Sequence, residues 1–113
     1  MRRAHEVRDE PPITLTIPGV VDRAAVSSWS IGHSPHPSDL SLVRPTDSDS
    51  PRLFQAVTNG AGGTASLVVR KLTPLGWVHQ MTLTLEGCMV NSYQPHGEDE
   101  SVGLTFAGMQ VER

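Results

Sequence analysis

Two long β-type segments in the C-terminal half of this sequence shift their apolar alternation at a glycine. Between residues 77 and 93, apolar side chains occupy every second position from residue 81 to residue 85, and the alternation moves by one residue after Gly87. Between residues 102 and 111, the same shift occurs at Gly108. Such a shift indicates a β-bulge or a sharp bend, through which a sheet curls on itself. The sequence therefore predicts a mainly β fold, either an antiparallel β-barrel or a tight sandwich.

Shorter β-strands are predicted before these segments. Residues 13–17 alternate isoleucine or leucine with threonine, which is the period-2 pattern of a strand with one buried face. In a second strand at 25–31, Trp29 and Ile31 share one face and serines occupy the other. Two more short strands are expected, one around 40–42 and one at 67–72.

A single short helix is predicted near 51–59, flanking the sheet. In DSDSPRLFQAVTNG, Ser50 stands where an N-cap residue would precede a proline at the first helical position. Leu53, Phe54 and Val57 are expected on one face, and Asn59-Gly60 supplies a left-handed stop. A helix of two to three turns is too short to be stable alone, so it must pack on the strands.

The chain has the usual size of one domain, with residues 13–113 as the β-barrel domain. Residues 1–12 are charged, end in Pro-Pro and are predicted to form a flexible arm. No apolar region follows the first basic residues, so no signal peptide is expected. No apolar run is long enough to span a bilayer, so no membrane insertion is expected.

Charge and cysteine content exclude several classes of protein. Nine Lys and Arg against twelve Asp and Glu give a net charge of −3, with no long run of either sign. Nucleic-acid binding therefore lacks its basic footprint. The single cysteine excludes an internal disulfide, which favours folding in a reducing cytosol.

The residues that could carry chemistry form no convincing set. Cys88 lies among apolar strand residues, where a cysteine usually acts as a small buried hydrophobe, and His96 has no obvious orienting acid. His33 and His36 lie in a polar loop and lack the further regular ligands that zinc requires. No catalytic, cofactor-binding or metal-binding residue is predicted, and the protein is not expected to be an enzyme. A cysteine-dependent enzyme remains the alternative that rapid alkylation of native Cys88 would support.

Two tryptophans keep a second class of function open. Trp29 and Trp77 are expected in the core or at an interface, but either could line a ligand pocket. The alternative function is therefore a small β-barrel binding module, such as a ligand carrier or an effector chaperone or adaptor, that forms no tube.

Five segments of the sequence form a set with a defined order and spacing. They are SSWSIG (27–32), DSDSPRLFQAV (47–57), LVVRK (67–71), MTLTLEGCMVNSYQ (81–94) and VGLTFAGMQVE (102–112). In this set the chain resembles the haemolysin-coregulated proteins, the inner-tube subunits of type VI secretion systems. The resemblance covers most of the chain from about residue 13 onward.

The resemblance implies a structural function and a set of partners. Six copies would close into a ring, rings would stack into a tube, and a contractile sheath would drive that tube with its spike protein into a target cell. Effector proteins would bind inside the ring or pass through it. Assembly would be cytoplasmic, with export through the apparatus itself, and no cofactor is implied. The matching regions place Arg52, Gln55 and Arg70 among the candidate contacts between subunits, with a solvated charged face as the alternative for each.

Two segments are shorter than in the family that the chain resembles. Only PGVVDRAAV separates ITLTI from SSWS, where the family usually carries a longer excursion that contributes to contacts between rings. The segment before DLSL is reduced to HSPHPS. The barrel and the ring are expected to tolerate these differences, whereas the stacking of rings is left open.

Overall fold

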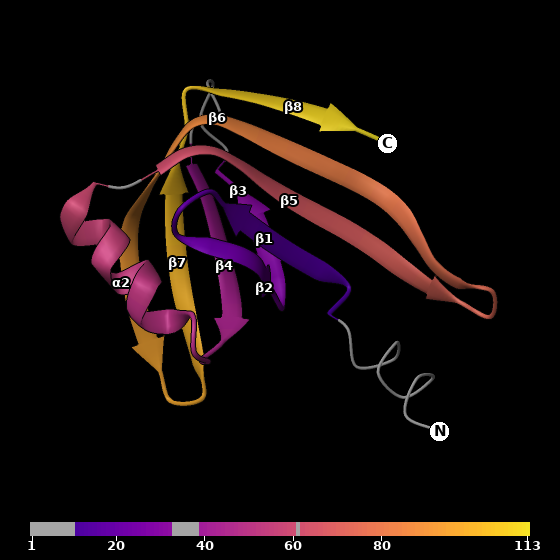
Figure 1. The fold of residues 1–113 in the computed structure, drawn as a ribbon, viewed down its shortest axis with the longest axis horizontal. Coiled ribbons are helices and arrows are strands. Elements are labelled where there is room, and N and C mark those ends of the chain that lie inside the picture. The colour runs from indigo at the N-terminus through magenta and orange to yellow at the C-terminus, as the bar shows by residue number, and fades with distance from the viewer. Residues whose placement is uncertain (1–10, 33–38, 61) are drawn as a thin grey trace.

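The computed structural model describes residues 11–32, 39–60 and 62–113. The fold is mainly antiparallel β-sheet with one helix, which confirms the predicted fold class (Figure 1). The elements in chain order are β1 (Ile13–Ile17), β2 (Val21–Ala25), β3 (Ser28–Ile31), β4 (Asp39–Pro45), α2 (Ser50–Asn59), β5 (Gly62–Thr73), β6 (Gly76–His96), β7 (Asp99–Thr105) and β8 (Gly108–Glu112). His33, His36 and most of the arm predicted at 1–12 lie outside the described residues.

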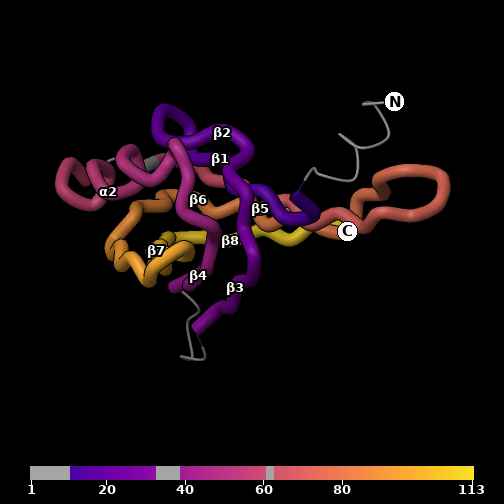
Figure 2. The backbone as a smooth tube through the Cα atoms, turned by 90° about the horizontal axis from the view of Figure 1, so that it is seen from below, coloured from indigo at the N-terminus to yellow at the C-terminus, as the bar shows by residue number. Residues whose placement is uncertain are grey.

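The strands form one curled sheet in the order β2-β1-β5-β6-β7-β4-β3, and β8 pairs with β6 off this path. In the described part of the chain, β2 and β3 are the two ends of this order and are not paired with each other. The link between them joins the two sides of the sheet, because Val26 N–H donates to Ile13 of β1 and Ser27 N–H donates to Val43 of β4. Figure 2 shows β1 and β2 on one side of the molecule and β3 and β4 on the other.

The curled sheet and the helix enclose one hydrophobic core. Its fully buried leucines come from β1, β4, β5, β6, β7 and α2, so every layer of the fold contributes to it. Each such side chain contributes roughly 1.5–3 kcal/mol relative to an exposed one. The leucines with an exposed fraction of 2% or less are Leu15, Leu40, Leu42, Leu53, Leu67, Leu83, Leu85 and Leu104.

The predicted bends at the two glycines are present. Gly87 has a φ of +61°, and Ala107 N–H donates to the carbonyl of Glu86 beside it at 2.8 Å. Residues 82–86 of β6 pair with β8, whereas residues from 89 onward pair with β7. The single strand expected at 102–111 is therefore two strands, since the chain turns between Thr105 and Gly108 and changes its partner region on β6.

The region at 21–31 also contains two strands where the sequence predicted one. β2 was missed because its buried residues, Val21 and Ala24, are three positions apart and do not follow a period of two. Arg23 between them has a φ of +54°, which takes this strand away from regular β geometry. In β3, Trp29 and Ile31 share the half-buried face and the serines are exposed, as predicted.

The helix expected near 51–59 is α2, and its beginning differs from the expected one. Asp49, not Ser50, occupies the N-cap position and makes no side-chain cap, while Ser50 Oγ accepts a hydrogen bond from Asp47 N–H. At the other end, Gly60 has a φ of +67°, as a left-handed stop requires. Leu53 is buried, but Phe54 is 59% exposed, so the prediction that Phe54 faces the core was wrong.

Candidate subunit interface

Two of the three predicted interface residues lie together on the exposed side of α2. Arg52 and Gln55 line a depression of about 210 Å³ between the helix and the turn that joins β1 to β2. Arg52 also borders a neighbouring depression of about 360 Å³, which Asp22 lines as well. Both side chains are exposed and charged or polar, so this side of the helix can contact another protein without disturbing the core.

The third predicted residue, Arg70, lies on β5 and lines neither depression beside α2. Its guanidinium is 4.7 Å from the ring centre of Trp77, and its Nη2 donates to the carbonyl of Pro11 at 3.0 Å. Its backbone N–H donates to Pro12, so the last two residues of the predicted arm are held against β5. Arg70 borders a groove of about 320 Å³ on the outer face of β1 that Arg23 also lines.

From Arg70 onward, β5 and β6 continue as a two-stranded hairpin, which we call the hairpin arm (residues 70–79). β1 pairs with β5 only as far as Val69, and β8 pairs with β6 only from Thr82 onward, so neither strand covers the arm. In Figure 1 the arm projects from the body on the side opposite α2. It carries three exposed apolar side chains, Leu72 at 40%, Leu75 at 100% and Val78 at 49%.

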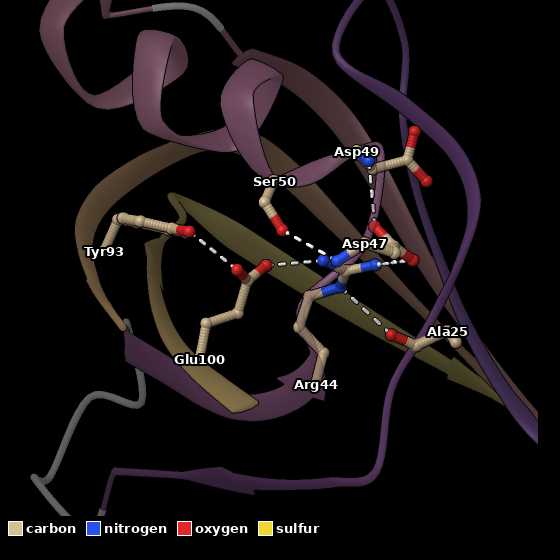
Figure 3. Close-up of polar contacts among 7 residues, drawn as sticks. All are labelled: Ala25, Arg44, Asp47, Asp49, Ser50, Tyr93 and Glu100. Carbon is tan, nitrogen blue, oxygen red and sulfur yellow. Dashed lines mark hydrogen bonds and ion pairs between the residues drawn. The ribbon is translucent and has the colours of Figure 1, made fainter. Parts of the chain in front are cut away.

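A buried ion pair lies under the start of α2 (Figure 3). Arg44 of β4 and Glu100 of β7 are both fully buried, and Arg44 Nη1 donates to Glu100 Oε2 at 2.5 Å. The other guanidinium nitrogens of Arg44 donate to Asp47 Oδ2 at 2.7 Å and to the carbonyl of Ala25 at 3.1 Å. Tyr93 of β6 donates to the second oxygen of Glu100 at 2.7 Å.

These contacts leave each charged group with partners, which a buried ion pair requires. No buried polar side-chain atom among the described residues lacks a hydrogen-bond partner. Burial alone would lower the pKa of Arg44, but hydrogen bonds and charge interactions with Asp47 and Glu100 raise it instead. The hydrogen bond to Glu100 is the main reason that the pKa of Tyr93 is raised. Arg44 therefore stays charged and Tyr93 stays protonated at neutral pH.

The ion pair positions the candidate interface. Through Asp47, whose N–H donates to Ser50 Oγ, Arg44 holds the segment that begins α2, and through Ala25 it holds the link between β2 and β3. Neither Arg44 nor Glu100 was predicted from the sequence. The sequence does contain a sign that both residues are buried. Arg44 continues the alternation of Leu40 and Leu42, and Glu100 begins the alternation of Val102 and Leu104.

The structure separates the residues considered for catalysis. Cys88 is fully buried, as predicted, and burial raises the pKa of its thiol to about 11. His96 lies at the far end of the same strand, where its ring nitrogen is 3.0 Å from Ser101 Oγ. In the described part of the chain, no three His, Cys, Asp or Glu residues are grouped to hold a metal ion. Nor does any helix there have the length and apolar character to cross a membrane.

The two tryptophans occupy different surroundings. Trp29 borders an open depression of about 330 Å³ lined largely by serines of β3, β4 and β7. Trp77 lies in the hairpin arm beneath the guanidinium of Arg70. The two rings therefore do not form a common ligand platform.

Comparison with known proteins identifies relatives with this fold. A sequence model of the family described as "Type VI secretion system effector, Hcp" matches residues 19–112. The solved structure of Hcp2 from Salmonella typhimurium has a TM-score of 0.73 at 24% identity, covering 88% of this chain and 91% of that one. A type VI secretion system effector from Yersinia pestis has a TM-score of 0.72 at 16% identity, covering 88% and 96%. A comparison with curated proteins found no match.

Proposed function

Because the chain belongs to the Hcp family of type VI secretion proteins, we propose that it is a ring-forming subunit of the tube of such a system. The family is one of structural, secreted proteins. The proposal is that six copies close into a ring with an open centre and that the rings stack into a tube. The observation that carries it is the match of the family model to residues 19–112, which includes all but the first strand of the sheet.

The placement of the candidate contacts supports a ring. In a head-to-tail interface, each copy contributes two different surfaces, and the assembly closes when the rotation between neighbours permits it. Arg52 and Gln55 lie on the exposed side of α2, whereas Arg70 begins the hairpin arm, which projects on the side opposite α2. We propose that these are parts of the two surfaces that meet between neighbouring copies.

The tube subunit would act together with other parts of the apparatus. We propose that the ring carries or passes effector proteins and meets a spike protein at the tip and a contractile sheath outside. Export through the apparatus itself would follow its assembly in the cytoplasm. The short connection between β1 and β3 is occupied by β2, which leaves no long loop there to reach a second ring. Stacking would therefore depend on other surfaces of the ring.

The mass of the purified particle tests the ring. The chain mass is 12.2 kDa, so native mass spectrometry and light scattering should give a particle of about six times that value. Negative-stain images should show annuli with an open centre. A protein that remains monomeric at high concentration would overturn the proposed function.

Variants on the exposed side of α2 test the predicted contacts. Arg52→Glu and Gln55→Glu should lower the fraction of rings without changing the far-UV circular dichroism, because both side chains point away from the core. Asp22→Asn is a suitable control for Arg52→Glu, since Asp22 borders the same depression but is not among the predicted contacts. Rings that form equally well with Arg52→Glu, Gln55→Glu and Arg70→Ala would remove all three from the interface.

A further inference from the structure

The hairpin arm exposes apolar side chains and is covered by neither β1 nor β8, so a partner could pack on it. An isolated two-stranded hairpin is marginally stable in water and gains stability when a further element packs on it. The arm exposes Leu75 at its turn completely, and it exposes Leu72 and Val78, on its two opposite faces, by nearly half. Leu75 at the tip is therefore the most exposed large apolar side chain in the described part of the molecule.

The arm is also basic. Residues 62–85 contain no Asp or Glu, while Arg70 and Lys71 supply two positive charges on opposite faces of the arm. Lys71 is paired across the hairpin with Val78, so a cation and an exposed apolar side chain share one face of the arm. A partner surface that fits this face must combine negative charge with an apolar contact.

The opposite side of the same chain has that combination. Glu98, in the turn that joins β6 to β7, and Asp99, the first residue of β7, lie beside the segment that begins α2, because Thr46 N–H donates to the carbonyl of Glu98 at 2.9 Å. Asp47 and Asp49 belong to that segment. We call these four residues the acidic end.

An exposed aromatic side chain adjoins the acidic end. Phe54 lies one turn of helix beyond Ser50, is 59% exposed and makes an edge-to-face contact with Tyr93, the ring centres being 5.7 Å apart. Tyr93 in turn donates to Glu100, the residue that follows Asp99. Figure 1 shows that α2 and the β6–β7 turn lie at the other side of the body from the tip of the arm. The arm therefore cannot reach this surface within its own chain.

We propose that the hairpin arm of one copy docks on the acidic end of a second copy, with Leu75 at its tip covered by Phe54 and Lys71 beside the carboxylates. The two surfaces differ and lie apart on one chain, so the contact is head to tail and repeats from copy to copy. The inference rests on the proposed function, since it names the surfaces through which the copies of the tube protein meet.

A pair of variants, each of which disables one of the two surfaces, tests this contact. Leu75→Asp places a negative charge at the fully exposed tip, and Phe54→Asp does the same on the receiving surface. Each alone should weaken association about tenfold or more, because a buried leucine or phenylalanine contributes roughly that factor. A mixture of the two variants has one intact arm and one intact acidic end. It should therefore form a dimer of about twice the 12.2 kDa chain mass and nothing larger.

Control variants distinguish a loss of this contact from a loss of folding and from a failure of the proposed function. Val111→Asp introduces the same charge at an apolar residue of β8 that is 47% exposed, close to the 59% of Phe54, and should leave assembly unchanged. Lys71→Glu should weaken association, and adding Glu98→Lys in the same chain should restore part of it. Circular dichroism verifies that each variant is folded, and Leu75→Asp removes no buried side chain.

The outcomes are distinct. If the wild-type protein assembles and Leu75→Asp assembles equally well, the inference is overturned while the proposed function stands. If the mixture of variants stays monomeric although each is folded, the pairing of arm and acidic end is overturned. If the wild-type protein never assembles, the proposed function fails and the inference fails with it.

Discussion

Arg44 and Glu100 form an ion pair in the interior of the protein, where neither side chain is exposed to solvent. The pair joins β4 to β7, and its remaining hydrogen bonds reach Asp47, Tyr93 and the carbonyl of Ala25. Strands from both sides of the curled sheet and the beginning of α2 are thereby fixed to one point.

Removing one partner of this pair should destabilise the protein strongly. Glu100→Gln leaves the buried guanidinium of Arg44 without its main counter-charge, and such a change costs roughly 3–5 kcal/mol. Asp47→Asn affects a side chain that is 38% exposed, so it should cost about 1 kcal/mol or less. Urea unfolding of both variants measures the two free energies, and a larger loss for Asp47→Asn would refute this account of the pair.

Tyr93 should make stability depend on pH in alkaline solution. Its hydrogen bond to Glu100 raises the pKa of the phenol above its ordinary value of 10.0. A raised pKa in the folded state means that the contribution is complete below about pH 10 and is lost as the pH rises through the folded value. The difference in unfolding free energy between wild type and Tyr93→Phe should therefore shrink above pH 10. Since the chain has one tyrosine, ultraviolet titration reports its ionisation directly, and a midpoint at or below 10.0 would contradict the prediction.

Cys88 should react slowly in the native protein. Burial raises its pKa from 9.0 to about 11, so the thiolate fraction at neutral pH falls about a hundredfold. Iodoacetamide should label the thiol slowly in buffer and at least a hundredfold faster in denaturant, with mass spectrometry following the adduct. Rapid labelling of the folded protein would instead favour a cysteine-dependent enzyme.

Gly87 should tolerate substitution less well than Gly97. Both have a positive φ, +61° and +68°, so alanine at either position should cost roughly 1–2 kcal/mol of backbone strain. A Cβ atom on Gly87 would also lie 3.2 Å from the Cβ of Ala107, whereas one on Gly97 would meet no atom within 4 Å. Thermal unfolding of Gly87→Ala and Gly97→Ala compares them, and equal losses would mean that the bend yields to the added methyl group.

The sequence predicted the features that follow from simple periodicity. Gly87 and Gly108 were found because an apolar alternation that shifts by one residue has few other physical causes. β2 was missed because Arg23 departs from β geometry and breaks the period. Arg44 and Glu100 follow the buried alternation, but a charged side chain at such a position looks solvent-exposed until its partner is known.

The candidate interface was predictable only in part. Arg52 and Gln55 came from the resemblance to a family, and the structure brings them together beside the β1–β2 turn. The turn of the hairpin at 74–76 was predictable, but the projection of the arm beyond the sheet was not, because Leu72, Leu75 and Val78 resemble ordinary strand and turn residues. Their exposure depends on where β1 and β8 end, which is a property of the whole sheet.

The pairing of β6 with β5, β7 and β8 also sets the order in which this chain can fold during synthesis. β4 pairs with β3 on one side, but its other partner is β7, which in turn lies beside the second half of β6, so the N-terminal strands leave the ribosome before all of their neighbours exist. Distant pairings of this kind slow folding and expose unpaired strands for longer. Refolding should therefore be slow for a chain of this size. A nascent chain that stops before β7 should depend on chaperones to stay free of aggregation.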